Sequence, residues 1–310
     1  MTKKIGFLFP GQGSQYVGMG KDLVENYPEA AKVFVLADET LGFSLSSIMF
    51  NGPEEKLLET AYSQLAIYLH SLAVVEILSS RTSITPAAVT GLSLGEYTAL
   101  VASGRISSVD GFNIISKRAQ FMNQACQQSP GAMAAVLGLT ADIVEQNLES
   151  LGDGIWVANY NAPKQLVIAG LREKIEEAIK LFTDLGAKRV ILLKVFGAFH
   201  TPLMQLAEDE LAPYLYNLNM NSSEISFVSN VTANFLRNND EILQCLVKQM
   251  TSPTLWYQSC SKIDLEVDEF LELGPGKVLA GLNRSIGLNK PIKSLGTVES
   301  INNFFRAIDI

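Results

Sequence analysis

The sequence of 310 residues contains little cysteine and no long apolar run. Its three cysteines, Cys126, Cys245 and Cys260, form no CxxC pair, and their odd number gives no disulfide framework. No stretch approaches the ~20 consecutive apolar residues that a membrane helix needs. The apolar run Ile5–Phe9 ends at Pro10, too early for the core of a signal peptide. We therefore expect a cytoplasmic protein without membrane association.

Charged residues are also scarce, at 18%, and the balance is acidic, with a formal net charge of -8. Nucleic-acid affinity rests largely on lysine and arginine side chains that neutralise phosphates, so this balance argues against nucleic acid as a partner. Hydrophobic residues make up 47% of the chain, and no segment is rich enough in proline, glycine or like charge to be disordered. The composition is that of an ordinary globular protein.

Apolar runs bounded by turn residues predict the strands of one mostly parallel sheet. Ile5–Phe9 stops at a glycine-rich turn, and Ala87–Gly91 passes through a very tight turn into a helical pattern. Two more strand candidates are interleaved with helices, as in α/β proteins, at residues 225–228 and 269–273. We expect residues 1–128 and 196–310 to form one large α/β domain.

The segment between these two parts, residues 129–195, has a pattern of its own. Strand-like and helical stretches follow one another there in the order β-α-β-β-α-β, which is the ferredoxin-like arrangement. In chain order the stretches are 132–139, 141–151, 155–159, 165–169, 173–185 and 189–195. We expect a ferredoxin-like α+β subdomain inserted into the larger domain.

Gly91-Leu92-Ser93-Leu94-Gly95 fits the G-x-S-x-G pattern, in which a serine occupies a strained turn between a strand and a helix. Small residues on both sides of the serine let the backbone pass close to its neighbours. The strand before the motif and the helix after it supply the setting that a nucleophilic serine requires, although an ordinary serine at a helix N-terminus is the alternative. As a nucleophile, Ser93 would have the Leu94 N–H as an oxyanion donor and would need a base within hydrogen-bond reach.

Only two histidines occur, His70 and His200. His70 lies in an apolar helical stretch without turn residues, which favours a structural role. His200 follows the predicted strand 189–195 and a short loop, at the end of a strand where α/β proteins place their functional residues. His200 is therefore the candidate base, and a plain surface-loop histidine is the alternative.

Arg118 lies on the apolar face of a predicted helix over residues 110–126. Stepping about 100° per residue places its side chain beside Ile115 and Met122. A buried guanidinium needs an anion or a set of acceptors, because an unpaired buried charge is very costly. Two partners fit equally well here: an internal carboxylate such as Glu96, or a substrate carboxylate, which arginine can bind through two parallel hydrogen bonds.

Gly11-Gln12-Gly13 follows the first predicted strand directly. It is not a dinucleotide-binding turn, because the third glycine of G-x-G-x-x-G would fall on Tyr16. A P-loop, G-x-x-x-x-G-K-[ST], is not present either. If Gly20-Lys21 supplied its G-K pair, the first glycine of the motif would fall on Gln15 and its last position on Asp22. What remains is a backbone able to approach a ligand closely, with the Gln12 N–H as a candidate second oxyanion donor.

In this order, these segments closely resemble the malonyl-CoA:acyl carrier protein transacylases over nearly the whole chain. Several motifs at matching intervals carry the resemblance, at residues 11–15, 91–97, 118, 157–163, 197–200, 249–256 and 273–276. One departure stands directly before the serine, where the family usually has histidine and this sequence has Leu92. We expect the chemistry to survive this change, since that residue is not the base, and the packing of the turn to differ.

The resemblance implies a hydrolase-like α/β domain with a ferredoxin-like insertion, and a covalent mechanism. It implies that Ser93 is the nucleophile, that His200 is first its general base and then an acid, and that the amides of Gln12 and Leu94 hold the oxyanion. In the family a backbone carbonyl, which maps to Gln249, orients the imidazole.

The resemblance also implies the substrates, malonyl-CoA and an acyl carrier protein, in fatty acid or polyketide synthesis. Arg118 would then pair with the malonyl carboxylate, and neither a metal nor a cofactor is expected. The run 197–200 is similar to the form that accompanies malonyl rather than methylmalonyl selection in polyketide acyltransferases. Carrier and coenzyme are both acidic, so docking calls for a basic rim, with these candidates: Lys188, Arg189, Lys277, Arg284, Lys290 and Lys293.

Two other functions compete with this one. A serine esterase or thioesterase of the G-x-S-x-G type predicts an acid between Ser93 and His200, a histidine near the chain end and an HGGG loop. His200 lies far from the chain end, with 110 of the 310 residues after it, and no HGGG run occurs. A carrier-binding protein without catalysis would not need Ser93 at all. The presence of a nucleophile, a base and an oxyanion loop together favours the acyltransferase.

Overall fold

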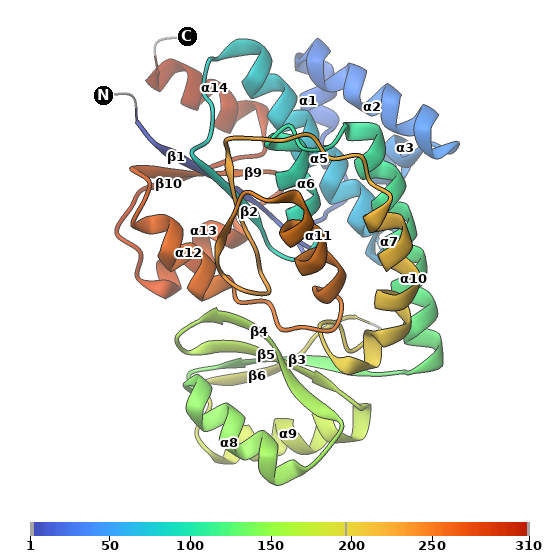
Figure 1. Ribbon diagram of the computed structural model, residues 1–310, viewed down its shortest axis with the longest axis vertical. Helices are drawn as coiled ribbons and strands as arrows, with labels where there is room; N and C mark the ends of the chain where they lie inside the picture. The colour runs from blue at the N-terminus through green and yellow to red at the C-terminus, as the bar shows by residue number, and fades with distance from the viewer. Residues whose placement is uncertain (1–2, 196, 309–310) are drawn as a thin grey trace.

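Two sheets organise the computed structural model, which describes residues 3–195 and 197–308 (Figure 1). Within these residues the larger sheet has six strands in the order β10-β9-β1-β2-β7-β8, and every pair is parallel except β7 with β8. Its strands are β1 Ile5–Phe9, β2 Ala88–Gly91, β7 Ser226–Val228, β8 Phe235–Leu236, β9 Glu269–Leu273 and β10 Ile292–Leu295.

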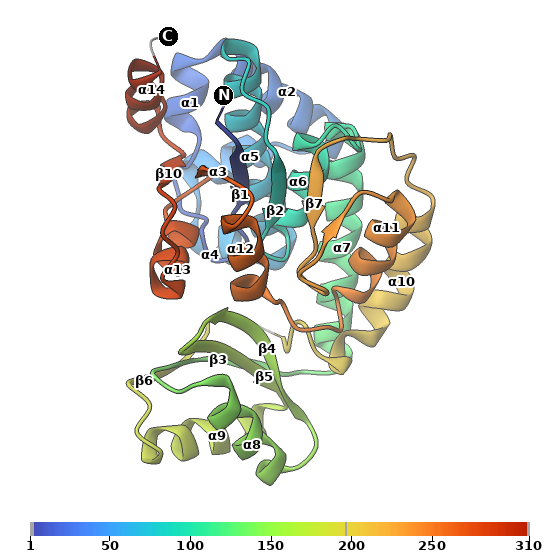
Figure 2. The same ribbon diagram turned by 60° about the vertical axis from the view of Figure 1, so that its left-hand side comes forward.

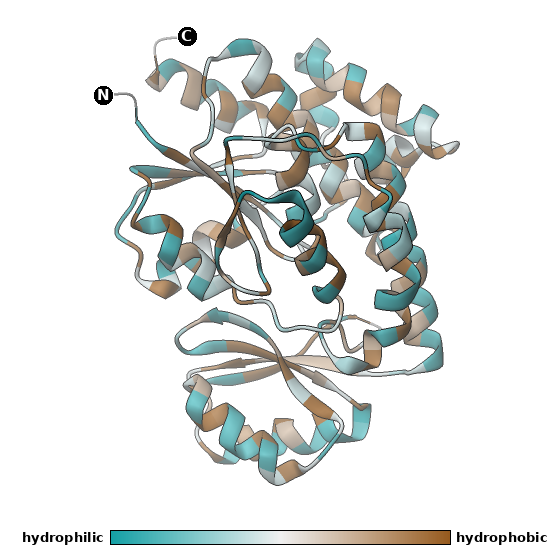
Figure 3. Cartoon of the chain, viewed as in Figure 1, coloured by the Kyte–Doolittle hydropathy of each residue, from teal (hydrophilic) through white to brown (hydrophobic). Residues whose placement is uncertain are grey.

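Both faces of the larger sheet are buried, which explains why its central strand β1 is continuously apolar. Side chains alternate along a strand, so Phe7 and Phe9 of β1 enter the main hydrophobic core on one face. Leu8, between them, enters a second core on the other face, together with Trp256 and Ile263. Figure 3 shows the strands at the centre largely in brown, while the helices around them alternate brown and teal.

Helices surround the larger sheet and connect its parallel strands. The helices before the second sheet are α1 Lys21–Asn26, α2 Pro28–Leu41, α3 Leu45–Asn51, α4 Glu54–Leu58, α5 Thr60–Arg81, α6 Gly95–Ala102 and α7 Ser108–Gln128. Those after it are the short 3-10 helix η1 Pro202–Met204, then α10 Gln205–Tyr216, α11 Asn239–Lys248, α12 Trp256–Asp264, α13 Val278–Ile286 and α14 Val298–Ala307.

Helix α5 is the central helix of the main core. In the described chain it is the one helix long and apolar enough to cross a membrane by length and composition, so our expectation that no such stretch exists was wrong. However, 78% of its most apolar window is buried inside the fold, as in a core helix. Its apolar character therefore has a packing explanation.

The second sheet has four strands, and all three pairs are antiparallel. Its strands are β3 Ala132–Leu137, β4 Ile155–Ala162, β5 Gln165–Gly170 and β6 Arg189–Leu192, and its helices are α8 Ala141–Leu151 and α9 Arg172–Asp184. The order β4-β5-β3-β6 places the first strand of the unit beside its third and fourth. A separate small core lies between this sheet and its two helices. The predicted fold class, a mostly parallel α/β sheet with a ferredoxin-like α+β unit, is confirmed.

The smaller sheet is joined to the segment between α11 and α12 by backbone hydrogen bonds at β4. Thr254 N–H donates to the Ala158 carbonyl (2.8 Å), and Tyr160 N–H donates to the Thr254 carbonyl (2.9 Å). Helices α12 and α13 also contact β4. Figures 1 and 2 show the four-stranded sheet between its own helices and the rest of the molecule.

The sequence predicted the long elements and missed the short ones. Strands β8 and β10 were not predicted, and the strands expected over 132–139 and 189–195 end earlier, at Leu137 and Leu192. The division into domains at 1–128, 129–195 and 196–310 stays a prediction. Its end points at residues 1, 196 and 310 lie outside the described residues.

Candidate active site

Ser93 occupies a strained turn between β2 and α6. Its φ of 52° lies in the left-handed region, which a residue with a side chain adopts only when its surroundings hold it there. The two glycines of the motif are required because there is no space for a side chain at either position. A Cβ at Gly91 would overlap the backbone of Gly95, and a Cβ at Gly95 would overlap the carbonyl of Phe9. The turn thus needs both glycines to pack against itself and against β1.

Asn230 holds this turn from the next strand of the sheet. It follows β7 and is completely buried. Its Oδ1 accepts from the Ser93 N–H (2.7 Å), and its Nδ2 donates to the Gly91 carbonyl (2.9 Å). Sequence reasoning missed this residue, because no local pattern marks an asparagine that acts across more than a hundred residues.

The structure brings His200 to Ser93. His200 is only 6% exposed and has a φ of 62°, a second strained position in the site. Its Nε2 lies 2.9 Å from Ser93 Oγ, and its Nδ1 lies 2.8 Å from the backbone carbonyl oxygen of Gln249. A carbonyl oxygen only accepts, so Nδ1 carries the ring proton and Nε2 is free to accept the proton of the serine hydroxyl. The partner of Nδ1 is thus a carbonyl, not the acid that the esterase alternative predicts.

Burial makes His200 a weak base that stays neutral. Burial, together with the positive charge of Arg118, lowers the pKa of the imidazole to about 4, although the hydrogen bond to Gln249 acts in the opposite direction. The imidazole is therefore unprotonated at neutral pH.

Arg118 of α7 points into the same site, as its helical position predicted. It is 1% exposed. Its Nη2 donates to Ser93 Oγ (2.9 Å) and to Gln249 Oε1 (3.0 Å), and its Nη1 donates to Gln64 Oε1 (2.5 Å). No carboxylate oxygen in the described chain lies within 4.0 Å of the guanidinium, so an ion pair with Glu96 is not formed. All three partners are neutral oxygens, and the charge is left for an anion to balance.

Gln249 contributes more than the backbone carbonyl that the resemblance implied. Its side chain is buried, and its Nε2 donates to the Ser93 carbonyl (3.0 Å) and to Glu96 Oε2. Its Oε1 accepts from Arg118. One residue therefore contacts the serine, the histidine and the arginine.

The two predicted oxyanion loops lie against each other. A Cβ at Gly11 would overlap the carbonyl oxygen of Leu92, so the loop after β1 packs directly on the turn after β2. Within the described residues, neither the Gln12 N–H nor the Leu94 N–H donates a hydrogen bond to the protein. Two unused donors beside the serine are what a developing oxyanion requires. Leu92 itself joins the core formed with α12 and α13.

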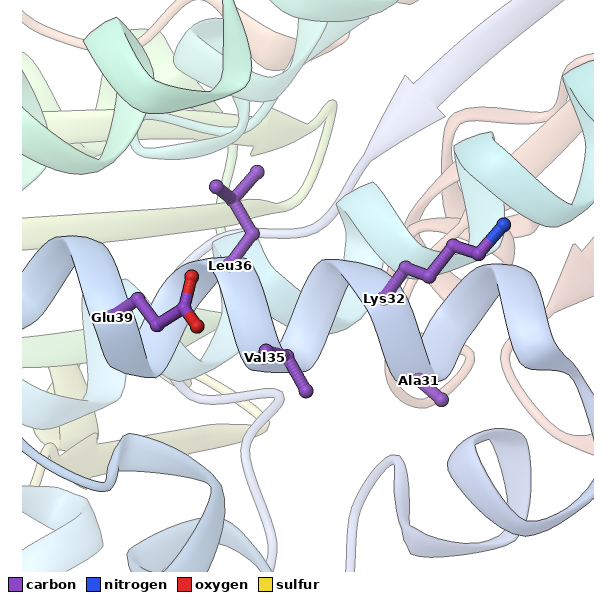
Figure 4. Close-up of a pocket in the computed structure, with 5 residues that line it drawn as sticks. All are labelled: Ala31, Lys32, Val35, Leu36 and Glu39. Carbon is purple, nitrogen blue, oxygen red and sulfur yellow. The ribbon is translucent and has the colours of Figure 1, made fainter.

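Other sequence candidates lie elsewhere. His70 is completely buried in α5, which agrees with a packing role. Among the described residues there is no group of three or more histidine, cysteine, aspartate or glutamate side chains that could hold a metal ion. A surface pocket is lined by residues of α2 alone, drawn in Figure 4 as Ala31, Lys32, Val35, Leu36 and Glu39. It contains no nucleophile and shares no residue with the Ser93 site.

Residues 6–282 match the family described as the acyl transferase domain. The chain belongs to this family. It is 41% identical to the malonyl CoA-acyl carrier protein transacylase of Bacillus subtilis, over 94% of this chain and 92% of that one. It is 38% identical to the protein of the same name from Staphylococcus aureus, over 97% and 98% of the two chains.

Solved structures of family members have the same fold. The acyl-carrier-protein-S-malonyltransferase of Bartonella henselae matches with a TM-score of 0.94 and 34% identity, over 99% of this chain and all of that one. A malonyl-transacylase in complex with a type II PKS acyl-carrier protein matches with a TM-score of 0.94 and 30% identity, over 98% and 99% of the two chains. The family expected from the sequence is confirmed, and the protein is an acyltransferase.

The low pKa of His200 predicts an unusual pH profile. Transfer of the Ser93 proton to His200 requires the neutral imidazole, whose pKa is lowered from 6.5 to about 4. Activity is then present at pH values above the pKa of His200 in the folded protein, and it is lost only as the pH falls through about 4. The measurement is kcat/KM for acylation against pH, with circular dichroism at each point to control for acid unfolding. Half-loss near pH 6.5, with the fold intact, would contradict the assignment.

Proposed function

We propose that this acyltransferase moves a malonyl group from coenzyme A to the phosphopantetheine thiol of an acyl carrier protein, through an ester on Ser93. The observation that carries the proposal is the position of Ser93 Oγ, 2.9 Å from both His200 Nε2 and Arg118 Nη2. A nucleophile, a base and a carboxylate-binding group thus meet at one atom. The names of the similar proteins point to the same reaction.

In the first half-reaction Ser93 Oγ forms a bond to the thioester carbonyl carbon while its proton passes to His200 Nε2. The carbonyl oxygen becomes an oxyanion, which the N–H groups of Gln12 and Leu94 hold. The carbon–sulfur bond then breaks, and the imidazolium returns its proton to the departing sulfur of coenzyme A. The Gln249 carbonyl keeps the ring in the orientation that both proton transfers need.

In the second half-reaction the same groups act in reverse. His200 takes the proton of the phosphopantetheine thiol, and the sulfur attacks the carbonyl carbon of the ester. The oxyanion forms at the same two amides, and the serine oxygen leaves with the proton from His200. The serine is restored, and the malonyl group is on the carrier.

Arg118 selects the acyl group by its distance from the serine. Only two carbon atoms separate the ester oxygen of a malonyl-serine from its carboxyl carbon. A guanidinium that is hydrogen-bonded to Ser93 Oγ is therefore close enough to bind that carboxylate. An acyl chain without a carboxylate would leave the buried charge without an anion, which disfavours it.

We also propose a cytoplasmic location. The three cysteines are free thiols, as a reducing compartment would keep them.

The covalent ester is the first test. Mixing the protein with malonyl-CoA should add the mass of one malonyl group to the intact protein, and Ser93→Ala should abolish the addition. Ser150→Ala, which removes an exposed serine of α8, is the matched control and should label fully. Labelling of the Ser93→Ala variant would show that another residue is the nucleophile.

The second test concerns the acyl group. Because Arg118→Ala removes the only charge offered to the carboxylate in this proposal, kcat/KM for malonyl transfer should fall by about 10²-fold or more, and for acetyl transfer by less than about tenfold. Lys117→Ala on the same helix removes a charge that stacks on Tyr214, away from the site, and serves as the control. Equal losses with both acyl groups would refute the role of Arg118.

The third test concerns the basic rim for the carrier. Arg189 begins β6 and Arg284 lies on α13, and Figures 1 and 2 show these two elements on the same side of the molecule. Lys293 is less available, because its Nζ lies 3.5 Å from Glu269. Arg189→Glu and Arg284→Glu should each raise KM for the carrier about fivefold, ~1 kcal/mol, and leave kcat unchanged.

Lys180→Glu makes the same change of charge on α9, which covers the outer face of the second sheet, and is the control for net charge. An unchanged carrier KM in both arginine variants would exclude this rim as the docking surface.

A further inference from the structure

Glu96 is a buried carboxylate whose role is not explained by the reaction steps. It lies in the first turn of α6 and is completely buried. Within the described residues it has no lysine, arginine or histidine partner within 4.0 Å. Burial raises its pKa to about 8, and the hydrogen bonds that it accepts act in the opposite direction. A carboxylate kept in such a position needs a reason.

Each oxygen of Glu96 accepts one hydrogen bond, and the two donors lead to different parts of the active site. Oε1 accepts from the Asn230 N–H (2.6 Å). Oε2 accepts from Gln249 Nε2. We call Glu96, Asn230, Gln249, Arg118 and Ser93 the Glu96 network.

The first arm of the Glu96 network supports the nucleophile. Asn230, whose backbone N–H is held by Glu96, uses its side chain to bind the N–H of Ser93 and the carbonyl of Gly91. The strained turn at Ser93 is thus tied to the carboxylate through a single residue.

The second arm supports the guanidinium. The Gln249 amide has acceptors on its nitrogen side, Glu96 and the Ser93 carbonyl, and a donor on its oxygen side, Arg118. This pattern permits one orientation of the amide, with Oε1 facing Arg118. The reversed amide would point N–H groups at the guanidinium and oxygen at the carboxylate, so both contacts would become repulsive.

We infer that Glu96 is a positioning residue for acyl selection, which fixes the Gln249 amide and through it the guanidinium that receives the malonyl carboxylate. The inference rests on the proposed function. Because the Gln249 amide lies between Glu96 and Arg118, Glu96 fixes that amide without occupying the hydrogen-bond donors of the guanidinium. A direct ion pair would occupy those donors and compete with the substrate.

Glu96→Gln is the sharpest test, because it keeps the shape of the side chain. The two donors to residue 96 are the Asn230 N–H and Gln249 Nε2. The oxygen of the new amide can accept from only one of them, and its NH₂ group must face the other. Where that group faces Gln249, the Gln249 amide has to reverse and present N–H to Arg118. We expect kcat/KM for malonyl transfer to fall on the order of 10²-fold, as displaced substrate-positioning groups do, and the malonyl to acetyl ratio to fall at least about tenfold.

Glu272→Gln is the matched control. Glu272 is also completely buried, and it accepts from the backbone N–H groups of Leu279 (2.8 Å) and Ala280 (3.1 Å) on the other side of β1. This substitution carries the same cost of burying an unmatched amide, so it should lower stability without moving the malonyl to acetyl ratio. A similar change of the ratio in both variants, or an unchanged ratio in Glu96→Gln, would overturn the inference.

A double variant, Glu96→Gln with Gln249→Glu, keeps the test decisive where the single variant does not fold. It restores a donor against an acceptor at the 96–249 contact and moves the carboxylate directly onto Arg118, while the hydrogen bond from residue 249 to the Ser93 carbonyl is lost. We expect a folded protein in which malonyl transfer stays low relative to acetyl transfer, and native malonyl selectivity in this variant would contradict the inference. If the unaltered protein forms no malonyl-serine, the proposed function itself fails; if it forms one and the ratios do not move, only the role of Glu96 fails.

Discussion

The site depends on the hydroxyl of Ser93 being held between an imidazole and a guanidinium. Both groups lie 2.9 Å from the same oxygen, one as acceptor of its proton and one as donor to its lone pair. This geometry is reached only because Ser93 is held at a φ of 52° by close glycine packing and by Asn230. The strain is local, and the surrounding parallel sheet, buried on both faces, supplies the stability that sustains it.

In the proposed reaction, acyl selectivity and the reactivity of His200 are coupled. Arg118 lowers the pKa of His200 and also offers the charge that a substrate carboxylate would neutralise. A bound malonyl group would therefore remove part of the effect that keeps the imidazole weakly basic, and it would make His200 a better proton acceptor. An acyl group without a carboxylate would bring no such change, so the correct substrate would improve the base that acts on it.

Sequence was sufficient for the groups that carry local signals. The G-x-S-x-G turn, the position of His200 after a strand, and the inward face of Arg118 each follow from spacing within a few residues. Asn230 and the Gln249 side chain could not be predicted, because their partners lie 137 and 131 to 156 residues away. Glu96 was considered as a direct partner of Arg118, and only coordinates reveal the intervening amide. The two strands that were not predicted, β8 and β10, are short. They are strands because they pair with the neighbouring strands β7 and β9, not because of a pattern in their own residues.

The seam between β4 and Thr254 consists of main-chain hydrogen bonds, which do not depend on the side chains of the residues that form them. Substitutions along β4 can therefore reshape the surface that the second sheet presents without loosening its attachment. These hydrogen bonds lie beside the segment that runs from Gln249 into α12, so side-chain changes on the smaller sheet can leave the backbone next to the reacting atoms in place.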